Sequence, residues 1–319
     1  MKLKLGLIGL GNQMQENLLP ALCEIDEAEI YTAYSRDPIK ANEIAEKYKI
    51  KKVARTTDEV FETCDAIIVS ATPEVHLHYI KKATQLGRAI FVEKPPVESL
   101  EQYDELRKII KEKNTPVAFG FNFKYADFYK YLIEQTNDFH NVQFMKIKSY
   151  AAKPDAAMWS CSGILESSLL AIHIHAIEML CYSFNSTTVQ IQSDTIWLSD
   201  TKFILTILVK FDNGRNGVLE LSNISNRFEF DVECASDTEV WRCNDFNKIE
   251  YSRNDNDGDT INRKSRVIYE VPFLRGGFER TGYQGELAEF AKRAKKRENN
   301  WREINNLRNV YQIIKEVTK

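Results

Sequence analysis

The sequence predicts an α/β protein in which a doubly wound parallel sheet precedes an α+β domain with a mostly antiparallel sheet. Short apolar runs alternate with helical patterns through residues 1–121, which is typical of parallel strands joined by crossover helices. Strand-like runs then cluster in residues 189–251, which indicates an antiparallel arrangement. The length of 319 residues exceeds one domain of ~100–200 residues. We therefore expect two domains, at residues 1–121 and 122–319.

The expected strands of the first domain are short. Strands are expected at residues 3–10, 29–34, 51–54, 66–70, 89–92 and 117–121. Helices are expected at residues 13–25 with an interruption at Pro20, from Asp37, at 76–86 and at 100–113. Asp37 suits an N-cap and Pro38 the first helical position, while Gly87 ends the helix before it.

The second domain begins with a helix and a strand before its strand-rich part. Helices are expected at residues 126–134, at 166–184 and from 285, with a strand at 142–150. Asp212-Asn213-Gly214 predicts a turn between strands, and the polar residues 252–265 predict a loop. The basic run at residues 292–297 is interpreted as a solvated helix face.

Composition excludes several classes of protein. Hydrophobic residues make up 43% of the chain, which excludes a disordered protein. The 43 Lys and Arg against 46 Asp and Glu argue against nucleic acid as a partner. We find no apolar run approaching the ~18 residues of a membrane span, and a glycine turn interrupts the apolar N-terminus, which argues against a signal peptide. Six scattered cysteines without a CxxC spacing indicate thiols in a reducing cytoplasm.

Gly9-Leu10-Gly11 follows the first expected strand and opens a helix. Glycines there let the backbone approach a pyrophosphate, and the helix N-terminus supplies N–H groups. Met14 stands where the third glycine of GxGxxG is usual. The alternative is a glycine turn that binds no ligand.

The end of the second expected strand bears on the choice of cofactor. NAD-binding folds place an acid there for the ribose 2′-hydroxyl, whereas an arginine accommodates a 2′-phosphate. Here the position is Ser35, followed by Arg36, and Asp37 is used for capping. The sequence therefore predicts NADP in preference to NAD, unless Arg36 is a solvated loop residue.

Several segments resemble the Gfo/Idh/MocA oxidoreductases. They are residues 6–14 (GLIGLGNQM), 65–73 (DAIIVSATP), Gly87, 93–96 (EKPP), Asn122 with Lys124 and Tyr125, Trp159 and His175. The resemblance is strong to Tyr125 and looser afterwards. It implies an N-terminal Rossmann domain and a C-terminal substrate-binding domain whose open sheet mediates oligomerisation, as a dimer or tetramer. The implied activity is hydride transfer between NAD(P) and a sugar, cyclitol or related carbonyl or alcohol.

Lys94 is the first expected catalytic residue. It ends an expected strand, where doubly wound folds bind ligands. Its ammonium can donate to a substrate oxygen and stabilise developing negative charge. Pro95 restricts Lys94 to extended geometry. The alternative is an ordinary exposed lysine.

His175 is the second, because it matches the histidine of the family pattern D-x-G-x-H-x-x-D. A neutral imidazole suits a general acid or base. Glu178 matches the last acid, but Ala171 replaces the first, and Glu166 is a candidate substitute for it. The alternative is a hydrogen-bonded core histidine. Two ligands on one helix face are too few for a metal, so none is expected.

The resemblance assigns the remaining site residues. The cofactor is expected to contact Gly9, Gly11, Asn12, Gln13, Ser35, Arg36, Ala71, Thr72, Pro73, His76, Glu93, Lys94 and Asn122. The substrate is expected to contact Lys124, Tyr125, Trp159 and His173, with Lys153 as a further candidate.

The function that we expect is a cytoplasmic NADP-dependent oxidoreductase acting on a polar carbonyl or hydroxyl compound such as a sugar derivative. Imine reduction is the alternative within enzymes. A non-catalytic dinucleotide-binding regulator is the alternative outside them, and Ala171 is the feature that favours it.

Overall fold

The computed structural model describes residues 1–253, 266–270 and 277–319, which divide into two compact units. The first contains Met1–Tyr125 and Gly276–Asn305, and the second contains Ala126–Arg275 and Asn306–Lys319. The first division falls four residues after the expected boundary at 121. The first unit also contains a C-terminal segment, Gly276–Asn305, so a single boundary in the sequence does not separate the two units.

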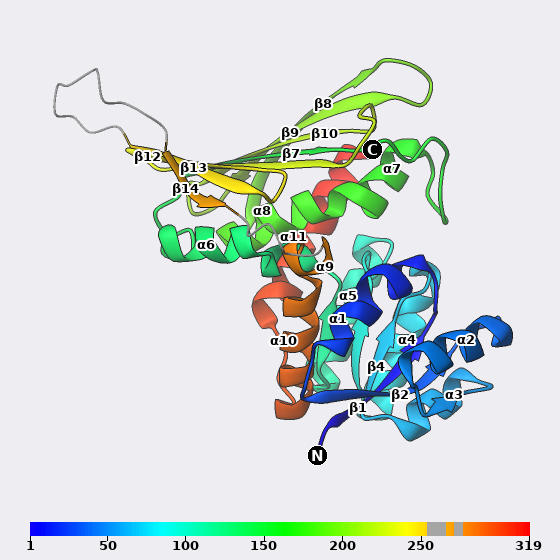
Figure 1. The fold of residues 1–319 in the computed structure, drawn as a ribbon. Helices are drawn as coiled ribbons and strands as arrows, with labels where there is room; N and C mark the ends of the chain where they lie inside the picture. The colour runs from blue at the N-terminus through cyan, green and yellow to red at the C-terminus, as the bar shows by residue number, and fades with distance from the viewer. Residues whose placement is uncertain (254–265, 271–276) are drawn as a thin grey trace. The chain divides into compact units, whose positions relative to one another are not determined.

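The first unit is built on a six-stranded sheet in the order β3-β2-β1-β4-β5-β6 (Figure 1). Its strands are β1 (Leu3–Ile8), β2 (Ala28–Tyr34), β3 (Lys52–Val53), β4 (Ala66–Val69), β5 (Ala89–Val92) and β6 (Val117–Phe119). All neighbouring strands pair in parallel, which confirms the doubly wound fold. The strand order reverses between β1 and β4, the place where such sheets bind ligands.

Helices pack on both faces of this sheet. They are α2 (Pro38–Tyr48), α3 (Thr57–Thr63), α4 (His76–Gln85), α5 (Leu100–Lys113), α9 (Gly277–Arg280) and α10 (Tyr283–Lys296), with 3₁₀ turns η2 (Pro73–Val75) and η3 (Asn122–Tyr125). Leu5 and Leu7 belong to the core cluster that includes Phe290 of α10. Gly6 faces α3, where a Cβ would collide with the side chain of Val60. Lys292 and Arg297 are exposed at the end of α10, as expected for a solvated face.

Two local features of the first unit differ from expectation. The expected first helix is a π-helix, η1 (Met14–Leu18), continued by α1 (Leu19–Cys23). Pro20 lies in the first turn of α1, where a missing N–H is tolerated. Helix α3 was not expected, although Thr56 caps it by accepting from Glu59 N at 3.3 Å.

The second unit contains an eight-stranded sheet in the order β14-β13-β12-β11-β7-β10-β9-β8. Its strands are β7 (Phe144–Tyr150), β8 (Thr188–Trp197), β9 (Phe203–Phe211), β10 (Asn216–Ser222), β11 (Glu229–Ala235), β12 (Glu239–Asn244), β13 (Lys248–Arg253) and β14 (Arg266–Glu270). Only the β7–β10 pair among them is parallel, so the sheet is mostly antiparallel, as predicted. Gly214 turns between β9 and β10 with φ +82°.

The helices of this unit lie on one face of the sheet. They are α6 (Asp127–Gln135), α7 (Ile164–Ser168), the π-helix η4 (Leu169–His173) and α8 (Ile174–Phe184), and α11 (Trp301–Val317) ends in this unit. Helix α8 packs so closely on β10 that a Cβ at Gly217 would lie 2.5 Å from Leu180. The expected helix at 166–184 therefore exists, but a π segment interrupts it. Strand β14 was not expected, and residues 254–265 of the expected loop lie outside the described residues.

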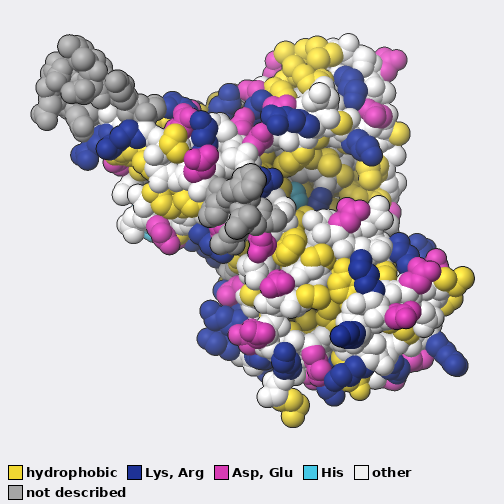
Figure 2. Space-filling view, in the orientation of Figure 1, with side chains coloured by type: hydrophobic (Ala, Val, Ile, Leu, Met, Phe, Trp, Pro, Cys, Tyr) yellow, Lys and Arg dark blue, Asp and Glu magenta, His cyan; other side chains and the backbone are white. Residues whose placement is uncertain are grey.

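One stretch among the described residues, Ile164–Phe184, is long and apolar enough to cross a membrane, with a mean hydropathy of 1.5. The sequence-based expectation overlooked it. The stretch is 78% buried inside the structure, and a core helix passes the same test. On the face of the molecule that Figure 2 shows, acidic and basic side chains are interspersed.

Candidate functional site

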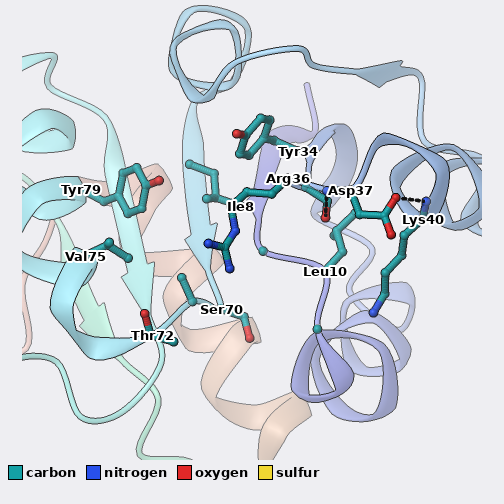
Figure 3. Close-up of a pocket in the computed structure, with 14 residues that line it drawn as sticks. Ile8, Leu10, Tyr34, Arg36, Asp37, Lys40, Ser70, Thr72, Val75 and Tyr79 are labelled. Atoms are coloured by element: carbon teal, nitrogen blue, oxygen red, sulfur yellow. Dashed lines mark hydrogen bonds between the residues drawn. The ribbon is translucent and has the colours of Figure 1, made fainter. Parts of the chain in front are cut away.

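A pocket with a volume of about 530 Å³ lies at the carboxyl ends of β1, β2 and β4 in the first unit (Figure 3). This is the point where the strand order of the sheet reverses. The lining residues are Ile8, Gly9, Leu10, Gly11, Tyr34, Ser35, Arg36, Asp37, Lys40, Ser70, Ala71, Thr72, Val75 and Tyr79. The fold therefore opens a cavity where a doubly wound sheet binds ligands.

Positions 9 and 11 of the first turn are occupied by glycine for different physical reasons. Gly9 has φ +87°, and a Cβ there would collide with the backbone oxygen of Ser70. A side chain at Gly9 is thus excluded by the fold itself. A Cβ at Gly11 would meet no atom within 4 Å, so the protein alone does not require glycine there. The missing side chain leaves open space for a close-approaching group.

The helix that follows begins directly at this turn. Gln15 N donates to Gly11 O at 3.1 Å, so the helical bonding starts from the pocket wall. Met14 is fully buried in the core of the unit. The residue that replaces the usual third glycine therefore points away from the pocket and does not fill it.

Two cations line the side of the pocket after β2. Arg36 extends its guanidinium into the pocket, and Lys40 lies in the first turn of α2 (Figure 3). Asp37 Oδ1 accepts from Ile39 N at 3.0 Å and from Lys40 N at 3.2 Å. This confirms that Asp37 caps α2. The pocket thus presents Ser35 beside two positive charges.

Sequence reasoning missed part of this lining, most clearly Lys40, Val75 and Tyr79. Val75 ends η2 and Tyr79 lies in the first turn of α4, and their spacing of four residues places both on one helix face. Burial raises the pKa of the Tyr79 hydroxyl, and the charge of Arg36 opposes that shift. The Tyr79 ring therefore adds an apolar wall with a neutral hydroxyl.

A second polar cluster lies at the end of β5, around Lys94. Gln13 Nε2 donates to Glu93 Oε1 at 2.9 Å and to the Tyr283 hydroxyl at 3.1 Å. The backbone N of Lys94 donates to Glu93 Oε2 at 3.2 Å. Glycine at position 120 leaves room for this carboxylate, because a Cβ there would lie 2.7 Å from Glu93 Oε2.

Burial acts in opposite directions on the two charged groups of this cluster. It raises the pKa of the Glu93 carboxyl, and the hydrogen bond from Gln13 and the charge of Lys94 oppose the shift. It lowers the pKa of the Lys94 ammonium, and the charge of Glu93 opposes that shift. Lys94 is nevertheless partly accessible at the surface. It is a lysine that releases a proton more readily than a solvated one.

Asn122 follows β6 and is fully buried. Its Nδ2 donates to Thr281 O at 2.9 Å, while its Oδ1 has no hydrogen-bond partner among the described residues. A buried acceptor without a donor is costly unless a ligand or water supplies one. Asn122 therefore fits its expected role in binding a group that carries N–H or O–H.

Lys124 is placed differently from expectation. Its Nζ lies 3.2 Å from Glu303 Oε1 at the start of α11, and the two side chains are 2% and 4% exposed. The ammonium thus forms an internal ion pair, and the contact of Lys124 with substrate stays a prediction. Tyr125 beside it is partly exposed.

In the second unit the two histidines occupy different environments. His173 is fully buried, with Nδ1 3.0 Å from Ser149 Oγ and its ring against Phe203. The side chain packs in the core, and its contact with substrate stays a prediction. His175 is 7% exposed in the first turn of α8, close to Glu178 in the sequence.

Glu166, the candidate substitute for the acid missing at Ala171, is hydrogen-bonded to Ser162. Glu166 Oε2 accepts from Ser162 N at 2.6 Å and from Ser162 Oγ at 2.7 Å. The Glu166 side chain is thus used at the N-terminus of α7. Ala171 itself is 7% exposed within η4.

Trp159 lies in a turn that the second unit holds in place. Cys161 N donates to Met158 O at 3.1 Å, and Trp159 has φ +53°. Met158 N donates to Ser167 Oγ at 2.8 Å. A left-handed tryptophan is uncommon and persists where the surroundings fix it. Trp159 is partly accessible, and Lys153 is exposed.

The structure thus brings part of the expected site together. The pocket contains Gly9, Gly11, Ser35, Arg36, Ala71 and Thr72, and the second cluster contains Gln13, Glu93 and Lys94. Asn12, Pro73 and His76 do not line the pocket. His76 is fully buried behind it. Among the described residues, no three His, Cys, Asp or Glu side chains form a group that could hold a metal ion.

Residues 3–121 match the model of an oxidoreductase family described as an NAD-binding Rossmann fold. A dTDP-3,4-didehydro-2,6-dideoxy-alpha-D-glucose 3-reductase from Saccharopolyspora spinosa is 27% identical over 38% of this chain and 36% of its own length. A D-xylose 1-dehydrogenase [NADP(+)] from Haloarcula marismortui is 24% identical over 37% of this chain and 34% of its own length. The alignments therefore cover about a third of each of these two relatives.

Solved structures extend the likeness over the whole chain. The crystal structure of a dehydrogenase from Chromobacterium violaceum has a TM-score of 0.92 and 26% identity. The match covers 99% of this chain and 94% of that one. The likeness thus includes the second unit, which the family model does not reach.

Proposed function

We propose that this chain, whose residues 3–121 match the model of the Gfo/Idh/MocA oxidoreductases, transfers a hydride between NADP and a polar carbonyl or hydroxyl compound. The observation that carries this proposal is the pocket at the reversal of strand order, with open space above Gly11 and two cations beside Ser35. When bound, the dinucleotide supplies the hydride donor or acceptor.

The chain offers distinct groups to each part of NADP. Gly9, Gly11 and the following helix N-terminus would hold the pyrophosphate. Ser35, Arg36 and Lys40 would hold the 2′-phosphate, because cationic donors form charge-assisted bonds to phosphate oxygens. The relative from Haloarcula marismortui, whose name specifies NADP(+), supports this choice.

The substrate class is proposed to be a sugar derivative. The names of two relatives, a dTDP-sugar reductase and a xylose dehydrogenase, support a carbohydrate. Lys94 would donate to the reacting oxygen and stabilise negative charge on it. The resemblance of His175 to the family histidine implies the role of accepting or returning the proton of the hydroxyl group. Tyr125 and Trp159 remain candidates for substrate contact.

A non-catalytic dinucleotide-binding regulator is the second candidate, because Ala171 stands in place of an acid and Glu166 is engaged by Ser162. Imine reduction is a further outcome of the same chemistry, since an imine does not need the acid that serves an alcohol. The regulator and the imine reductase would both bind the dinucleotide in the pocket, but only the imine reductase would turn over a substrate.

The deciding experiment is NADPH oxidation by the purified chain against a panel of keto-sugars, nucleotide keto-sugars and cyclic imines. We expect turnover with a keto-sugar. We expect the Lys94→Ala variant to lose ~10²–10³ in kcat while cofactor affinity stays within a few-fold. Tight NADPH binding without turnover of any panel member would instead support the regulator, and turnover of imines alone would support an imine reductase.

We also propose a cytoplasmic homo-oligomer. Four cysteines are buried thiols, namely Cys64, Cys181, Cys234 and Cys243, and unoxidised thiols suit a reducing compartment. Light scattering of the purified chain and cell fractionation test the two statements separately. A monomer in scattering, or recovery outside the cytoplasm, would contradict them.

A further inference from the structure

His76 connects two loops that belong to different parts of the site in the first unit. Its Nε2 lies 3.1 Å from the carbonyl oxygen of Ala71, which follows β4 and lines the pocket. Its Nδ1 lies 2.9 Å from the carbonyl oxygen of Pro95, the residue after Lys94. The ring is fully buried, so water does not compete for these carbonyls. A neutral imidazole carries one N–H and donates to one of the two carbonyls, whereas a protonated ring donates to both.

The position of the ring is itself fixed by local structure. Pro73 begins η2, Val75 N donates to Thr72 O at 3.2 Å, and His76 begins α4 directly afterwards. The backbone of His76 is therefore continuous with the pocket wall after β4. Through the imidazole, the same turn contacts the residue after Lys94.

We propose that His76 is a positioning residue, which holds Lys94 in register with the wall of the dinucleotide pocket through the carbonyl groups of Pro95 and Ala71. The proposal rests on the proposed function in that Lys94 acts on the substrate. A shift of ~1 Å in a reacting group can cost ~10²-fold in rate, so one buried ring between two loops is sufficient to control the placement of the ammonium.

The test compares His76→Leu, which removes both contacts, with His76→Gln, whose amide can still donate to a carbonyl. His78→Leu is the matched control, because His78 lies two residues along the same helix and is exposed. We expect kcat to fall at least ~10-fold in His76→Leu and to recover in part in His76→Gln. NADPH affinity should stay within about three-fold and His78→Leu should match the wild type.

A double-mutant cycle separates positioning from a general structural role. If His76 acts through Lys94, His76→Leu should cost less than about two-fold more in a Lys94→Met background. An undiminished further loss in that background would overturn the proposal, as would unchanged kcat in His76→Leu. Failure of both His76 variants to fold would also overturn it, since the ring would then serve the fold as a whole.

A readout without turnover keeps this inference separate from the proposed activity. If the wild type reduces nothing in the panel, the proposed function fails and amide hydrogen exchange decides the link. We expect the peptide containing Lys94 to exchange at least ~10-fold faster in His76→Leu, with no change in His78→Leu. Equal exchange in the two variants would reject the link whether or not the chain is an enzyme.

Discussion

Gln13 and Glu93 are eighty residues apart, yet Gln13 Nε2 donates to Glu93 Oε1 at 2.9 Å. Gln13 belongs to the helical start after the glycine turn, and Glu93 precedes Lys94 at the end of β5. One hydrogen bond thus links the start of the helix after the glycine turn, the proposed phosphate-binding element, to the residue that precedes the proposed catalytic lysine. The other oxygen of this carboxylate accepts from the Lys94 backbone N. The two oxygens of Glu93 therefore bind Gln13 and Lys94 respectively.

This relationship predicts a pH effect of Glu93→Gln. The charge of Glu93 raises the pKa of Lys94, against the larger lowering by burial. Removing that charge should lower the pKa of Lys94 further, so the protonated form should be lost at lower pH. We expect the basic limb of the kcat/KM profile to move to lower pH, whereas Glu98→Gln, as a control, should leave it in place. An unmoved limb would mean that Glu93 carries no charge in the working enzyme.

The two glycines of the turn form a matched pair. Gly9→Ala should lower the free energy of unfolding by more than about 2 kcal/mol, because the new Cβ meets the Ser70 carbonyl. Gly11→Ala should keep wild-type stability, since its Cβ meets nothing, but should weaken NADPH binding ~10-fold or more. Urea unfolding and fluorescence titration measure the two quantities. Unweakened binding in Gly11→Ala would show that the pyrophosphate lies elsewhere.

Arg36→Ala should weaken NADP binding selectively. Losing a charge-assisted hydrogen bond costs about 1.5–3 kcal/mol, so the Kd for NADP should rise ~10-fold or more. The Kd for NAD should stay within about two-fold, because NAD has no 2′-phosphate. Lys47→Ala removes an exposed charge from the last turn of α2, outside the pocket lining, and serves as the control. An equal effect of Arg36→Ala on both cofactors would contradict the assignment of the 2′-phosphate.

Substitution of His175 should affect the rate, whereas substitution of His173 should affect stability. His175→Asn should lower kcat and remove an ionisation from the kcat/KM profile, while stability stays close to that of the wild type. His173→Asn should instead cost about 2 kcal/mol of unfolding free energy, because it loses the contact with Ser149 in the core. A rate loss in His173→Asn at unchanged stability, with an active His175→Asn, would reverse the assignment.

The failures of sequence reasoning concern contacts between distant segments. Lys124 matches a family motif, but the residue that neutralises it is Glu303, which no local pattern connects with it. The residues Lys40 and Tyr79 line the pocket because strand order brings α2 and α4 to one end of the sheet. The strand β14 pairs with β13 across residues 254–265, so its own short sequence carried little signal.

The sequence by itself determined the alternation of strands and helices, the glycine turn, the cap at Asp37 and the order of the two architectures. These features depend on local periodicity and on backbone preferences of single residues, which any sequence displays directly. Only the tertiary structure decided which buried polar groups meet, as with Gln13 and Glu93 or His76 and Pro95. The reason is physical: a buried polar atom must find its partner wherever the packed chain brings one within hydrogen-bond distance, and separation along the sequence does not limit that choice.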